Sequence, residues 1–166
     1  MKKIFILILG VVSVITVSAQ QDPQFSQNMF NKLANNPGFA GSRGNIATSV
    51  LHRSQWMGFE GAPTTQNFSI DAELPFLHGG VGLNVVKDNI AEFSNLALQA
   101  SYAYRTELGV GQIGMGMSVG MYQSGINGGA LKPAQIGDNA IPTGEVKGSG
   151  LDIGAGIYYN PQDFYI

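Results

Sequence analysis

The sequence predicts an all-β protein, part of a transmembrane antiparallel β-barrel that contributes about six to seven strands of a larger barrel. In five segments apolar and polar residues alternate with a period of two, which places them on opposite faces of a sheet. Beyond the N-terminal leader, no apolar run approaches the roughly 20 residues of a membrane-spanning helix. The 23 glycines in 166 residues are also about twice the usual frequency. Together these observations favour membrane strands over membrane helices.

The first 19 residues have the three parts of a cleavable secretory signal peptide. Lys2 and Lys3 precede an apolar run, Ile4–Val17, and the small residues Ser18 and Ala19 complete the cleavage site. We therefore expect the protein to be exported with residues 1–19 removed.

Composition excludes several classes of function. Loss of Lys2 and Lys3 leaves seven basic residues against eleven acidic ones, a formal charge of −4, so no basic stripe is available for nucleic acid. The chain has no cysteine, which rules out disulfides and thiolate metal sites.

Six strands are expected along the chain, and the clearest is Gln112–Tyr122. Its odd-numbered residues from Ile113 to Met121 are apolar, while the intervening positions are mostly Gly and Ser. A further strand would start at Phe164, so the chain is expected to be the N-terminal part of a longer protein. The six strands are Asn45–Arg53, Asn67–Leu74, Val81–Val86, Asn95–Arg105, Gln112–Tyr122 and Gly150–Tyr159.

The polar faces of these strands carry Gly, Ser, Asn and isolated acids instead of the Lys, Glu and Thr of a soluble sandwich. This composition is typical of a barrel interior. We expect long connections at Ser54–Pro63, Lys87–Phe93 and Gln123–Ser149 on the outer side, and short ones on the periplasmic side. With this orientation, three tyrosines lie near the periplasmic ends of their strands, at the periplasmic interface of the outer membrane: Tyr102, Tyr104 and Tyr159.

Residues 20–44 are predicted to form a periplasmic segment that leads into the barrel at residues 45–166. A polar stretch rich in Asn and Gln runs from Gln21 to Thr65. It contains three motifs: Gln21–Gln27, Asn36–Gly41 and Gln55–Thr65. In these motifs the chain resembles the PorP/SprF family, outer-membrane proteins of the type IX secretion and gliding apparatus of Bacteroidota.

The resemblance implies a non-enzymatic outer-membrane component that supports export or surface attachment of cargo proteins. It also implies machinery proteins as partners on the periplasmic side, exported cargo on the outer side, outer-membrane lipid around the barrel, and no cofactor. Asp22–Gly41 is assigned to periplasmic docking or to sealing the barrel entry. The candidate partner-binding residues are Asp22, Pro23, Gln24, Phe25, Trp56 and Phe59; the two aromatic ones fit a docking site or a membrane-interface girdle equally well.

No motif predicts catalysis. Gly109–Gly114 has dinucleotide-binding spacing but leads into a strand, where that chemistry needs a helix. His52 and His78 lack close metal-ligand partners, and no nucleophile elbow is present. Asp71, Glu73, Asp152 and Arg105 are expected to form a hydrated polar network inside the barrel, although paired carboxylates also permit acid–base chemistry. The alternatives left open are a passive porin-like channel, an outer-membrane hydrolase and a secreted soluble barrel.

Overall fold

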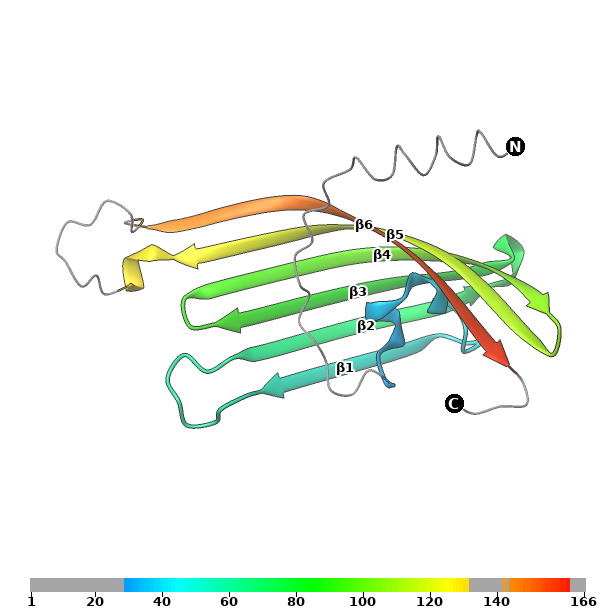
Figure 1. Ribbon diagram of the computed structural model, residues 1–166, viewed down its shortest axis with the longest axis horizontal. Helices are drawn as coiled ribbons and strands as arrows, with labels where there is room; N and C mark the ends of the chain where they lie inside the picture. Colours follow the sequence, from blue (N-terminus) through cyan, green and yellow to red (C-terminus); the bar gives the residue numbers. More distant parts are fainter. Residues whose placement is uncertain (1–28, 132–141, 143, 162–166) are drawn as a thin grey trace, which may run out of the picture.

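The computed structural model describes residues 29–131, 142 and 144–161. Most of this part is one six-stranded antiparallel sheet, with its strands paired in sequence order (Figure 1). All six predicted strands are present. Five of them run longer than the alternation alone indicated, and β1 starts two residues later and ends one residue later than predicted. They are β1 (Ala47–Ser54), β2 (Thr64–Leu74), β3 (Gly79–Ile90), β4 (Phe93–Leu108), β5 (Gly111–Asn127) and β6 (Glu145–Pro161).

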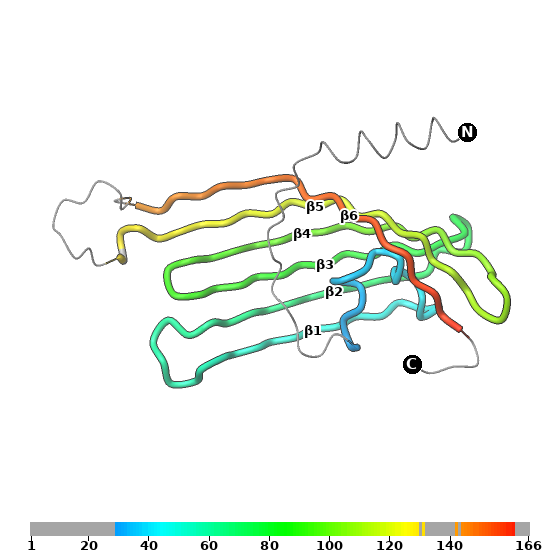
Figure 2. The backbone as a smooth tube through the Cα atoms, in the orientation of Figure 1, coloured from blue at the N-terminus to red at the C-terminus, as the bar shows by residue number. Residues whose placement is uncertain are grey.

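Within the described residues, four short helical turns accompany the sheet, and the backbone trace shows the first two lying across it (Figure 2). None of the helices in the described residues has the length and apolar character needed to cross a bilayer. The turns are α2 (Lys32–Asn35), η1 (Pro37–Phe39), η2 (Pro75–Leu77) and η3 (Gly128–Ala130).

The sheet is open, so the predicted barrel is confirmed only as an antiparallel sheet. β1 pairs with β2 alone and β6 with β5 alone, which leaves both as edge strands of the described sheet. Closure requires hydrogen bonds between first and last strands, and pairing strictly in sequence order does not supply them here.

Two predicted connections are corrected. Lys87–Phe93 is not a long loop, because β3 continues to Ile90 and β4 starts at Phe93, joined by a two-residue turn in which Ala91 has a φ of 49°. Gln123–Ser149 is also shorter as a connection, since β5 runs to Asn127 and β6 begins at Glu145. Both errors arose because the polar ends of these strands lack the apolar alternation that marks their centres.

One face of the sheet is apolar and exposed. Met117 is 66% exposed and Leu151 84%, and exposed apolar side chains recur at alternate positions along β4 and β5, with Val50 and Phe68 on the same face of β1 and β2. The register aligns these side chains into cross-strand rows, of which the first complete one is Val50, Phe68, Val85, Leu98, Met121 and Leu151.

Two mostly polar rows border this apolar band toward the β1–β2, β3–β4 and β5–β6 connections. Leu96 is their only large apolar member. The first row is His52, Gln66, Lys87, Leu96, Gln123 and Ser149, and the second is Ser54, Thr64, Asn89, Ser94, Gly125 and Lys147.

The opposite face is polar and largely buried where β2–β5 form it, whereas no residue of β6 is buried. It contains Asn67, Ser69, Asp71 and Arg105 on the face predicted to line a barrel interior, each 9% exposed or less. A soluble domain buries its apolar face, so this sheet has the inverse polarity.

Candidate functional site: the inner segment on the polar face

Residues 31–43, here called the inner segment, lie against the polar face of the sheet (Figure 1). Its α2 turn contacts β2 and β3, and η1 contacts β4, β5 and β6. The segment therefore bridges five strands of the sheet. No group of three or more His, Cys, Asp or Glu side chains suited to a metal ion occurs in the described ranges.

Local sequence explains the compact course of the inner segment. Asn36 ends α2 with its amide N–H bonded to the Lys32 carbonyl at 3.0 Å, and its side-chain oxygen accepts from Gly38 N–H at 2.9 Å. Pro37 starts η1, where its fixed φ suits a first helical position and its missing N–H costs nothing. Gly41 has a φ of 70°, which lets the chain turn toward β1.

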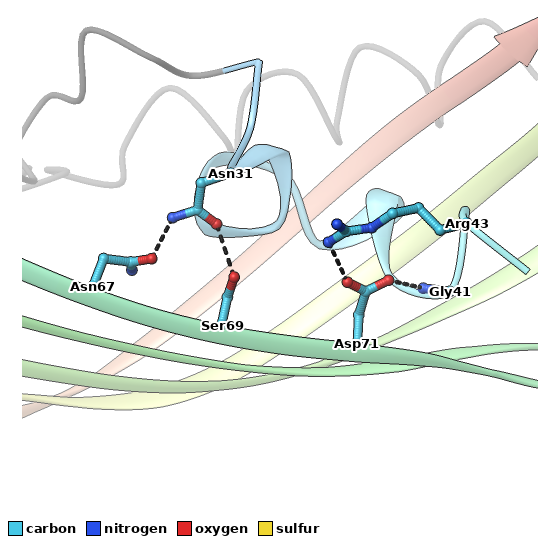
Figure 3. Close-up of polar contacts among 6 residues, drawn as sticks. All are labelled: Asn31, Gly41, Arg43, Asn67, Ser69 and Asp71. Carbon is cyan, nitrogen blue, oxygen red and sulfur yellow. Dashed lines mark hydrogen bonds and ion pairs between the residues drawn. The ribbon is translucent and has the colours of Figure 1, made fainter. Parts of the chain in front are cut away.

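Asn31 anchors the start of the inner segment. Its side-chain amide donates to Asn67 Oδ1, and its Oδ1 accepts from Ser69 Oγ at 3.1 Å (Figure 3). Asn67 Nδ2 in turn donates to Asn84 Oδ1 at 2.7 Å, extending the contact to β3. Asn31 is 1% exposed, so these bonds replace its lost hydration.

Asp71 anchors the other end. Its carboxylate accepts from Arg43 Nη2 at 2.6 Å and from the Gly41 N–H at 3.2 Å (Figure 3). The Asp71 side chain is fully buried and that of Arg43 is 34% exposed. A buried carboxylate is costly unless paired and hydrogen-bonded, and the inner segment supplies both kinds of partner.

Between these anchors lies a small apolar contact. Leu33, Phe39 and Ala40 of the inner segment form a buried cluster with Ala103 of β4, and Tyr158 of β6 packs against it. The Phe39 and Tyr158 rings meet edge to face, with centroids 5.0 Å apart. Asn36 Nδ2 also donates to the Ile157 carbonyl at 2.9 Å, which ties η1 to the β6 backbone.

Glycines on the sheet make this close approach possible. A Cβ on Gly116 would overlap the backbone of Pro37 and Gly38, and one on Gly156 would overlap the Asn36 side chain. Gly80 meets Ala40 and Gly41 in the same way. The glycine content of the polar face thus has a definite role, because it lets the backbone of the inner segment reach the backbone of the sheet.

The predicted polar network is arranged differently from expectation. Asp71 pairs with Arg43, whereas Arg105 donates to Gln112 Oε1 at 3.3 Å. Asp152 accepts from Gln99 at 3.2 Å. The sequence interpretation missed Arg43 and Asn31 because both precede the first strand and carry no periodic pattern.

The sequence-predicted partner residues fall into two groups. Asp22, Pro23, Gln24 and Phe25 lie outside the described residues. Trp56 and Phe59 are 70% and 71% exposed in the β1–β2 connection, which is separated from the inner segment by the length of β1.

Comparison with known families supplies the remaining observation. The family model described as type IX secretion system membrane protein PorP/SprF matches residues 17–166. The chain belongs to the PorP/SprF family. No curated protein and no solved structure matches it. As a PorP/SprF protein it is a non-enzymatic membrane component of the type IX secretion system, in agreement with the resemblance seen in the sequence.

Proposed function

We propose that this PorP/SprF protein forms part of an outer-membrane β-barrel whose interior is occupied by its own inner segment. In this role it supports export or surface attachment of cargo and does not act as an open diffusion channel. The observation that carries the proposal is the seating of residues 31–43 on the buried polar face while the opposite apolar face is exposed. Exposed Leu, Ile, Val and Met side chains suit hydrocarbon, and buried polar ones suit a barrel lumen.

The position of the inner segment favours sealing of the barrel entry, which is one of the two roles assigned to Asp22–Gly41. Its contacts with five strands would narrow a lumen. We assign residues 22–28 to the docking of secretion-machinery proteins on the periplasmic side.

We assign the Trp56–Phe59 loop to contact with exported cargo on the outer side. Gln55 N–H bonds to the Pro63 carbonyl at 3.0 Å and Ala91 N–H to the Gly61 carbonyl at 2.9 Å, so the loop is braced at its base. Two mostly polar rows separate it from the apolar band. This separation favours protein docking over a membrane-interface girdle, because girdle residues border the hydrocarbon directly.

Deletion of residues 22–41 tests the proposal. Secretion of type IX cargo should be lost while the protein still migrates as a heat-modifiable folded barrel. Planar-bilayer conductance provides a second measurement: the intact protein should be closed, and a double variant N31A/D71A, which removes both anchors, should show openings. Unchanged secretion after the deletion, or steady conductance by the intact protein, would refute the proposal.

A further inference from the structure

A hollow of about 500 Å³ lies on the apolar face of the sheet, near the ends of β1, β2 and β3. Its floor includes Val50, Phe68 and Val85, which belong to the first complete row of the apolar band. Its lining also includes His52, Gln66 and Lys87 of the first polar row, together with Leu96 of the same row. The hollow is therefore apolar at one end, and three polar side chains border it at the other.

The charge at the polar end of the hollow is unbalanced. Lys87 makes no ion pair within the described part of the chain, where the pairs are Arg43–Asp71 and Lys147–Glu145. Neither of the two polar rows contains an acidic residue. Lys87 consequently presents an uncompensated ammonium group beside the donors of His52 and Gln66.

We propose that this hollow binds one anionic membrane lipid, with its phosphate on Lys87, His52 and Gln66 and an acyl chain over Val50, Phe68 and Val85. A lysine at the edge of a lipid-facing surface places its stem on apolar neighbours and its ammonium among headgroups. Three donors on adjacent strands match the several acceptor oxygens of a phosphate. The inference rests on the proposed membrane orientation of the sheet.

The test uses purified protein reconstituted in phosphatidylcholine bilayers with a minor fraction of phosphatidylglycerol. Native mass spectrometry after release from the bilayer counts the lipids that remain bound. The protein should retain phosphatidylglycerol over phosphatidylcholine, and K87Q should lower this retention about fivefold, the effect of one lysine near an anionic surface. K87R should restore it.

Lys147→Gln is the matched control, because Lys147 lies in the second polar row, faces the same side and is paired with Glu145 at 2.9 Å. It should retain phosphatidylglycerol as the parent does. Equal retention by K87Q and the parent, or no preference between the two lipids, would overturn the proposal. Displacement by inorganic phosphate would instead indicate a free-anion site and overturn the lipid assignment. Heat-modifiable migration, recorded for each variant, separates failure of this site from failure of the membrane orientation.

Discussion

Phe39 and Tyr158 meet edge to face, with ring planes at 80°, although one precedes the first strand and the other lies in the last described strand. Lys32 Nζ lies 5.4 Å from the centroid of the same tyrosine ring and 3.4 Å from its hydroxyl. Tyr158 is thus a shared contact for α2 and η1. The inner segment is held by specific side chains as well as by the glycine surface beneath it.

The absence of a side chain at Gly116 should be required for the inner segment to lie against the sheet. In G116V the added side chain would collide with the Pro37–Gly38 backbone and displace η1. Since the chain has no cysteine, a single L33C, normally 1% exposed, reports displacement by its reaction with maleimide. Reactivity should rise in L33C/G116V and stay low in L33C/G150A, because a Cβ at Gly150 meets nothing within 4 Å. Equal labelling of both would contradict the contact.

Removal of the Asp71 carboxylate should destabilise the protein. D71A leaves Arg43 and the Gly41 N–H without their partner, at a cost of about 2–3 kcal/mol. Urea-induced unfolding in detergent micelles measures the loss. The control D152N alters a carboxylate on the same face that bonds only to Gln99, and it should cost well under half as much. Comparable losses in the two variants would argue against an anchoring role for Asp71.

Lysine should impair folding into lipid at one residue of β4 and be tolerated at the next. Leu98 lies on the exposed apolar face and Gln99 on the polar one. Lysine on a lipid-facing surface costs about 2–4 kcal/mol at the bilayer midplane and less toward the edge of the apolar band, where Leu98 lies. Folding into lipid vesicles should therefore be impaired by L98K and preserved in Q99K, whose ammonium lies near Asp152. The reverse order would show that the sheet is turned the other way.

The exposed aromatics of the β1–β2 loop should matter for secretion and not for folding. W56A/F59A removes two side chains that are 70% and 71% exposed. Cargo release into the medium, measured by immunoblot, should fall severalfold while membrane insertion is unchanged. F76A changes an equally exposed aromatic in η2 at the opposite end of the sheet and should secrete normally. Normal secretion by W56A/F59A would remove the loop from the proposed docking surface.

Alternation predicted the strands well because it is strongest where one face is uniformly apolar. Gln112–Tyr122, with its apolar side chains at every second position, forms the first two-thirds of β5. Alternation does not mark the strand ends. Lys87, Asp88 and Asn89 are polar on both faces, so the predicted strand stops at Val86 although β3 continues to Ile90. Period alone carries no information on such positions.

The inner segment could not be placed from sequence. Asn31, Asn36 and Arg43 find their partners 36, 121 and 28 residues away, and nothing in their local pattern specifies those distances. Its polar composition and its position before the first strand indicated only that it belonged near the barrel entry. Alternation places Gly116 and Gly156 on the polar face, but their backbone contacts depend on the three-dimensional fold.

The long separation between Asn36 and Ile157 has a consequence for biogenesis. The hydrogen bond between them joins residues 121 positions apart, so it cannot form until β6 has taken its place beside β5. Contacts between residues so far apart in sequence form late, because nearer pairings must first reduce the entropy cost of bringing the two residues together. Placement of β6 beside β5 would then be the step that fixes η1 on the sheet, so seating of the inner segment would be completed late in maturation.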